Sequence, residues 1–210
     1  MSFIVTASGR EVSREFPLQS DFCMEDIAHA LALTNRFQGH TARPYSVAEH
    51  SLLVLKIARD TLGLDVHGQM YALMHDAHEA YTGDQSSPSK VVIGGAWRAF
   101  ETRFQHLVSM RFGFHRGMVA YHEEVKQADL LALALERQQL MPSHRPDGHP
   151  CQAWPVLADI HTRPEVLGVD LQDPGRESMT WQQWRDAFLQ AACDLEVARM
   201  RTTTFDRKAA

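Results

Sequence analysis

Apolar residues recur at spacings of three and four positions along most of this chain, which is the spacing of one face of an α-helix. The start of one helix is marked by Ser46 and Glu49, a capping box in which each side chain accepts a hydrogen bond from the other residue's backbone amide. Gly63 and Pro142 are typical of helix ends. The pattern predicts an all-α fold, with helices over approximately residues 24–33, 47–62, 68–82, 96–112, 118–141 and 180–199.

Two segments depart from this pattern. The first twenty residues place short apolar stretches around the turn-forming Ser8-Gly9-Arg10, which predicts an extended segment or a hairpin. Residues 142–175 contain six of the nine prolines, which predicts an irregular excursion before the last helix. No internal repeat or low-complexity tract divides the 210 residues, so we expect a single domain over 1–210.

Composition narrows the class of protein. Hydrophobic residues make up 44% of the chain and the net charge is −5, which excludes a protein that coats nucleic acid. No apolar run reaches the roughly 20 residues of a membrane span, and the N-terminus lacks the pattern of a signal peptide. We therefore expect a cytoplasmic protein without a membrane partner, in which Cys23, Cys151 and Cys193 are free thiols.

The 12 histidines are the one compositional excess, and two of them lie in the stretch His75-Asp76-Ala77-His78-Glu79. On a helix over 68–82, His75 and Glu79 would share a face because they are four residues apart, and Asp76 would lie about 100° round. His75 and Asp76 could then bind a divalent metal ion. Glu79 would stay unligated and handle protons on a water molecule bound to the metal.

Two side chains rarely make a tight metal site, so further ligands must come from other helices. His50 and Asp129 are the best candidates, because each is predicted on an apolar, core-facing helix, where an unpaired ionisable group is costly. Two histidines and two aspartates form a mixed nitrogen and oxygen set. Such a set suits one divalent ion, which could be Mn, Co, Fe, Ni, Zn or Mg.

These residues also fall in an order known from a protein family. The ligands match the H…HD…D signature of the HD-domain metal-dependent phosphohydrolase superfamily. The resemblance is sharpest to its bacterial 5′-deoxynucleotidase branch, on the motifs Arg36-Phe37, Ser46-Val47-Ala48-Glu49-His50-Ser51, His75-Asp76-Ala77-x-Glu79, Thr82-Gly83-Asp84, Pro88-x-Lys90 and Ala128-Asp129. Asp26-Ile27-Ala28-His29-Ala30-Leu31 and Gly39-His40-Thr41 are similar to related phage and bacterial HD proteins. The likeness covers about residues 24–140, the expected HD core, and the extension 142–210 carries little of it.

The resemblance implies a helical bundle around one metal ion and a role for each matched residue. Metal ligands would be His50, His75, Asp76 and Asp129. Glu79 would handle protons, and Asp84 would be an acidic residue needed near the substrate. Arg36 and Lys90 would contact the substrate phosphate. Phe37 replaces a tryptophan that helps to exclude a ribose 2′-hydroxyl in the deoxynucleotidases, so the sugar preference stays open.

The implied activity is release of phosphate from (deoxy)nucleoside 5′-monophosphates by attack of a metal-bound water. One alternative is a dNTP triphosphohydrolase that releases tripolyphosphate, and another is a non-catalytic, nucleotide-sensing HD module. The resemblance also implies a homodimer that binds a small nucleotide and no nucleic-acid polymer. For Arg36 alone, capping of the preceding helix is the competing role. A zinc site at His144, His149, Cys151 and His161 is disfavoured, because their spacing matches no common zinc pattern.

Overall fold

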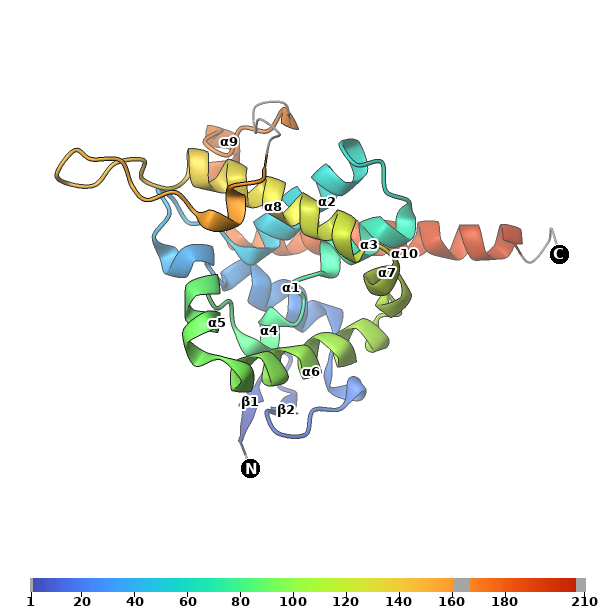
Figure 1. The fold of residues 1–210 in the computed structure, drawn as a ribbon. Coiled ribbons are helices and arrows are strands. Elements are labelled where there is room, and N and C mark those ends of the chain that lie inside the picture. The colour runs from blue at the N-terminus through green and yellow to red at the C-terminus, as the bar shows by residue number, and fades with distance from the viewer. Residues whose placement is uncertain (1, 161–166, 207–210) are drawn as a thin grey trace.

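The computed structural model describes residues 2–160 and 167–206 and confirms the all-α prediction (Figure 1). An N-terminal hairpin pairs β1 (Phe3–Val5) with β2 (Glu11–Ser13) in antiparallel register, with Ile4 opposite Val12. Within the described ranges, this hairpin is the only sheet. No helix in those ranges has both the length and the apolar character needed to cross a membrane.

Helices account for most of the remaining chain. The α-helices are α1 (Met24–Leu33), α2 (Val47–Asp60), α3 (Val66–Met74), α4 (Glu79–Thr82), α5 (Ser87–Ile93), α6 (Gly95–Arg111), α7 (His115–Ala120), α8 (His122–Gln139), α9 (Pro174–Glu177) and α10 (Trp181–Asp206). Short 3-10 helices are η1 (Gln19–Asp21), η2 (Arg36–Gly39) and η3 (Pro155–Leu157). Thus the described part of the segment 142–175 is mainly irregular, as predicted.

Helix α2 lies at the centre of the bundle and contacts α1, α3, α8 and α10. Its apolar side chains pack with those of its neighbours into one core, which includes Ile27, Leu31, Val54, Ile57, Leu73, Leu135 and Phe188. Helix α10 crosses α1, α2 and α3, and its C-terminal end extends beyond the other helices (Figure 1). The C-terminal extension therefore completes the core around α2.

The single helix expected over 68–82 is wrong. Helix α3 ends at Met74, residues 75–78 form turns, and α4 begins at Glu79. The turns are closed by short-range bonds from the Ala77 amide to the Met74 carbonyl (3.0 Å) and from the Glu79 amide to the Asp76 carbonyl (2.9 Å). The break lets consecutive ionisable side chains reach different partners, which one straight helix face would not allow.

The helix expected over 118–141 is also divided, because α7 ends at Ala120 and α8 begins at His122. A close approach to α3 explains the change of direction. A Cβ atom on Gly117 would lie 2.8 Å from the His67 carbonyl oxygen, so only glycine fits there. At the break, the Tyr121 hydroxyl donates a hydrogen bond to Asp65 (2.7 Å), which caps the start of α3.

Between the helices expected over 68–82 and 96–112, the structure adds α5, a helix that the sequence pattern did not predict. Pro88 lies in the first turn of this helix, where proline fits because no amide hydrogen is needed there. The Ser86 hydroxyl accepts a bond from the Ser89 amide and caps the helix. Val91 and Val92 are exposed on α5. This short helix carries Lys90 toward the interior of the bundle.

A buried ion pair fastens the C-terminal extension to α2. The Arg43 guanidinium donates two bonds to the fully buried Glu49 carboxylate, at 2.7 and 2.9 Å, and also donates to the Leu171 carbonyl. Arg176 adds a third bond to Glu49 at 2.9 Å. Glu49 therefore serves two arginines, one before α2 and one on α9.

We expect Glu49→Gln to lower the free energy of unfolding by about 3 kcal/mol, because both arginines would lose their buried counter-charge. Urea unfolding of the full chain measures this loss. Asp60→Asn is the matched control, since Asp60 pairs with Lys56 and Arg59 on the exposed surface and should cost less than about 1 kcal/mol. Equal losses in the two variants would contradict the assigned importance of Glu49.

Candidate metal centre

Three of the predicted metal ligands meet at one point between α2 and the turn that follows α3. His50 lies in the first turn of α2 and is fully buried. Its Nε2 atom is 3.3 Å from His75 Nε2 and 3.6 Å from Asp76 Oδ2, and His75 Nε2 is 3.1 Å from the same Asp76 oxygen. These atoms come from two separate elements and form a compact triangle.

The size of this triangle fits coordination of one ion. Nitrogen and oxygen ligands bind first-row metal ions at about 2.1 Å, which places neighbouring ligand atoms about 3.0 to 3.4 Å apart in octahedral or tetrahedral geometry. The three separations fall close to this range. His50, His75 and Asp76 could therefore hold a metal ion.

Asp129, the fourth predicted ligand, reaches the same point from α8. Its Oδ1 atom is 3.4 Å from His50 Nε2, while its Oδ2 atom accepts a hydrogen bond from Lys126 Nζ at 2.9 Å. Asp129 is not part of the compact three-residue group. Its contact with the group is the one to His50, so the role of Asp129 as a metal ligand stays a prediction.

Both histidines are oriented by bonds to their Nδ1 atoms. His50 Nδ1 is 2.6 Å from Glu136 Oε1, and His75 Nδ1 is 2.8 Å from the Ala72 carbonyl oxygen. A carboxylate and a carbonyl can only accept, so both Nδ1 atoms carry hydrogen. This leaves both Nε2 atoms for the cluster, the arrangement usual for metal-binding histidines.

Glu136 is a site residue that the sequence analysis missed. It is fully buried, and its carboxylate accepts bonds from Tyr45 (2.9 Å) and Arg36 (3.1 Å) in addition to His50. Its position seven residues after Asp129 was the available signal, because residues seven apart lie on the same helix face. Glu136 is a charged residue among the apolar positions of α8, and this placed it on the same buried helix face as Asp129.

Arg36 brings positive charge to the centre, and its backbone amide donates a hydrogen bond to the Tyr45 carbonyl (2.9 Å) just before α2. The guanidinium lies 3.1 Å from Glu136 and 3.6 Å from Asp76. Burial alone would lower the pKa of Arg36, but these carboxylates outweigh burial and raise it. Within residues 2–160 and 167–206, its buried Nε atom has no hydrogen-bond partner.

The carboxylates also stabilise positive charge on His50. Burial and Arg36 disfavour the imidazolium, yet Glu136 and Asp129 outweigh them and raise the pKa of His50 to about 9. For Asp76, burial would raise the pKa, but His75, His50 and Arg36 hold it well below its usual range. The point where these atoms meet is therefore one that favours a cation.

Glu79 has the opposite electrostatic character. It is buried on α4, and burial together with the negative charges of Asp76 and Asp84 raises the pKa of Glu79 well above its usual value. The pKa of Asp84 is also raised, first by burial and then by Asp76, although Arg36 opposes the shift. Two neighbouring carboxyl groups, Asp76 and Glu79, thus favour different protonation states, which is a common feature of acid–base sites.

Lys90 lies beside Glu79 rather than beside the metal ligands. Its Nζ atom is 3.7 Å from Glu79 Oε1 and 2.6 Å from Glu101 Oε1, and His78 Nε2 is 3.5 Å from the same Glu101 atom. His78, Glu79 and Glu101 form a second group of side chains that could hold a metal ion. Lys90 already supplies a positive charge to it. Glu101, on α6, is another residue that the sequence analysis missed.

Phe37 follows Arg36 in η2 and has a left-handed backbone with a φ of 53°. The Arg36 guanidinium carbon lies 5.3 Å from the centre of the Phe37 ring. Phe37 therefore lies beside Arg36, and Asp84 is close enough for the charges of Arg36 and Asp76 to shift its pKa. Contacts of Arg36, Phe37 or Lys90 with a substrate stay predictions. Of the disfavoured zinc set, His144 and His149 are exposed, and His161 lies outside the described residues.

We expect Asp76→Asn to weaken Mn²⁺ binding by at least about tenfold, because the ion would lose a charged ligand and the two histidines a nearby carboxylate. Isothermal titration calorimetry on the wild type should give one ion per chain. Asp60→Asn removes a carboxylate from the exposed end of α2 and should leave the affinity unchanged. Wild-type affinity in Asp76→Asn would place the ion elsewhere.

No protein-family model matches this chain. It is 38% identical over 137 residues to the uncharacterized protein RCAP_rcc00048 of Rhodobacter capsulatus, an alignment that covers 63% of this chain and 70% of that protein. It is 34% identical over 160 residues to the uncharacterized protein YfdR of Escherichia coli K12, covering 76% of this chain and 81% of that protein. The identity and the coverage show that the chain belongs to the protein family that includes YfdR and RCAP_rcc00048.

Proposed function

We propose that the protein is a metal-dependent phosphohydrolase that releases phosphate from nucleoside 5′-monophosphates. The observation that carries the proposal is the convergence of His50, His75 and Asp76 on one cation-favouring point. Beside that point lies Glu79, a buried carboxyl group with a raised pKa. This arrangement supports the resemblance of the motifs to HD-domain phosphohydrolases.

The donor set fits a divalent ion of the Mn, Co, Fe, Ni, Zn or Mg group, because it mixes imidazole and carboxylate ligands. His50, His75 and Asp76 would hold the ion, and Asp129 would join them by a small movement from His50. When bound, the ion would polarise the phosphoryl group and lower the pKa of the attacking water.

The chain's own residues supply the remaining functions. Arg36 would bind the phosphate, since its buried Nε has no partner among the described residues and its guanidinium lies beside Asp76. Glu79 would accept the proton of the attacking water, because a carboxylate whose pKa is raised above its usual value is a stronger base. Lys90 and Glu101 would hold Glu79 in place. Asp84 adds negative charge beside Glu79 and so strengthens it as a base.

The direct test is a screen of nucleotides with the Mn²⁺- or Co²⁺-loaded protein, with identification of the products. We expect inorganic phosphate and a nucleoside from at least one nucleoside 5′-monophosphate. Tripolyphosphate from a deoxynucleoside triphosphate would replace the proposal with the triphosphohydrolase alternative. Nucleotide binding without any product from metal-loaded protein would favour the nucleotide-sensing alternative.

Glu79→Gln separates proton handling from metal binding. We expect turnover to fall by about 10²-fold or more, the usual contribution of a general base, while one Mn²⁺ still binds with nearly wild-type affinity. Phosphate release and calorimetry on the same preparation measure the two effects. Glu124→Gln, on the exposed face of α8, is the control and should retain both properties. Loss of the metal in Glu79→Gln would make Glu79 a ligand and refute the assigned role.

A further inference from the structure

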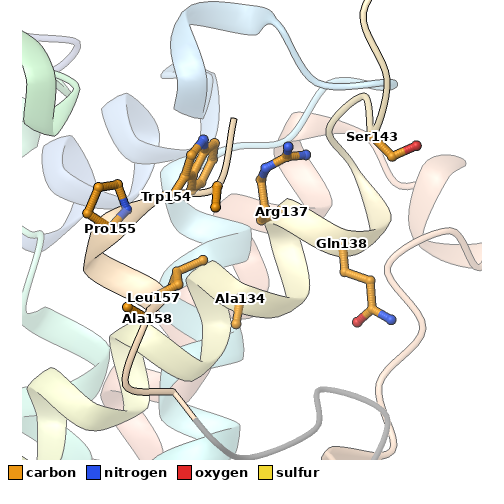
Figure 2. A pocket seen from close by; sticks show the side chains of 9 residues that line it. Ala134, Arg137, Gln138, Ser143, Trp154, Pro155, Leu157 and Ala158 are labelled. Carbon is orange, nitrogen blue, oxygen red and sulfur yellow. The ribbon is translucent and has the colours of Figure 1, made fainter. Parts of the chain in front are cut away.

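A hollow of about 520 Å³ lies between α8 and the segment 153–158, which contains η3 (Figure 2). Its volume is within the range of sites for small organic molecules. Ala134, Pro155 and Leu157 form apolar walls, and Arg137 and Ser143 bring polar atoms to the rim. The chemistry suits a flat, weakly polar group with hydrogen-bonding atoms at its edge.

Trp154 gives this hollow an aromatic wall. Its indole ring is half-buried, and the Arg137 guanidinium carbon lies 5.2 Å from the ring centre. Arg137 is itself held by a bond from its NH1 atom to the Pro142 carbonyl (2.7 Å). In Figure 2 the two side chains lie next to each other at the edge of the hollow. Indole and guanidinium planes are the surfaces on which nucleic-acid bases stack in proteins.

A chain of contacts joins Trp154 to the metal centre. The ring centres of Trp154 and Phe37 are 5.8 Å apart, and Phe37 lies under the guanidinium of Arg36 at 5.3 Å. Arg36 in turn lies 3.6 Å from the Asp76 carboxylate. The aromatic side chains Phe37 and Trp154 therefore lie next to Arg36, the side chain proposed to bind phosphate.

Helix α8 places the two regions together as well. Its Asp129 and Glu136 face the metal centre, and the next residue after Glu136 is Arg137, which lines the hollow. Helix α8 thus contributes residues to both regions, the one suited to phosphate and the one suited to a planar ring. A nucleotide joins these two chemical groups through one sugar.

The backbone at Phe37 supports a positioning role. Phe37 and Gln38 have φ angles of 53° and 55°, a left-handed conformation that is unfavourable for residues with side chains. Two such residues in succession persist only where the surroundings hold them, and this conformation is common at ligand sites. Here it sets the Phe37 ring between Arg36 and Trp154.

We propose that this hollow binds the base of the nucleotide substrate, with Trp154 as the surface on which the base stacks. The inference rests on the proposed function, because the phosphate of the same molecule would lie at Arg36 and the metal centre. It assigns a binding role to the proline-rich excursion. That segment lies outside residues 24–140, where the motifs of the sequence occur.

The test compares nucleotides with the same molecule lacking its base. Calorimetry on the Mn²⁺-loaded full chain carrying Glu79→Gln, which is expected to keep the metal but to lose turnover, measures the Kd of four deoxynucleoside 5′-monophosphates and of 2-deoxyribose 5-phosphate; the tryptophan variants are made in the same background. Trp154→Leu keeps an apolar side chain but removes the ring. We expect it to raise the Kd of at least one nucleotide roughly tenfold, the effect of losing one stacked base, and to leave the Kd of 2-deoxyribose 5-phosphate unchanged.

Trp181→Leu is the matched control, because Trp181 packs against His29 and Arg185 at the start of α10 and not in the hollow. It should change neither Kd. The proposal is overturned if Trp154→Leu leaves the affinity for every nucleotide unchanged, if it weakens the binding of 2-deoxyribose 5-phosphate equally, or if the Glu79→Gln chain with Trp154 intact binds none of the nucleotides.

This result is distinguishable from failure of the proposed function, since binding is measured without turnover. Base-dependent binding that requires Trp154, with no phosphate release from any nucleotide, would retain the hollow as a base site and reject the hydrolase. Phosphate release from nucleotides with a KM that does not depend on Trp154 would retain the hydrolase and reject the base site.

Discussion

The fully buried carboxylate of Glu136 is the interaction on which the arrangement of the centre depends. It accepts bonds from His50, Arg36 and Tyr45, which belong to three different positions at or before the start of α2. An unpaired charge at this depth would be strongly destabilising, so α8 can pack on α2 only with these partners in place. These bonds permit the two helices to pack. They also orient the His50 ring so that its Nε2 atom points toward His75 and Asp76. Stability and the geometry of the candidate metal centre thus have one physical cause.

The turn after α3 has a comparable effect on protonation. By ending the helix at Met74, it sends Asp76 toward two histidines and Arg36, while Glu79 faces Lys90 and Glu101. Neighbouring positive charge lowers the pKa of Asp76, whereas burial and nearby carboxylates raise the pKa of Glu79. Two carboxyl groups three residues apart in sequence are thereby suited to different tasks, one to holding a cation and the other to exchanging a proton.

The C-terminal extension is part of this design of the bundle. Its Leu171 carbonyl accepts bonds from Arg43, which precedes α2, its α9 is held by Glu49 on α2, and α10 covers α1, α2 and α3. The excursion that precedes them places Trp154 against Phe37. In the proposed mechanism, residues of the helical bundle would bind and hydrolyse the phosphate ester, and the extension would bind the base of the substrate.

The sequence by itself determined the all-α class, the bounds of α1, α2 and α6, the capped start of α2, the irregular excursion and the identity of three residues that meet at the centre. These follow from local periodicity, capping and turn chemistry, which act over a few residues. Only the tertiary structure decided the helix break at 75–78 and the hydrogen bond between Glu136 and His50. It also decided the ion pair of Lys90 with Glu101 and the contact of the Trp154 ring with Phe37. Each of these depends on charges or rings that lie far apart in the chain, and their pairing is decided by which helix faces pack together.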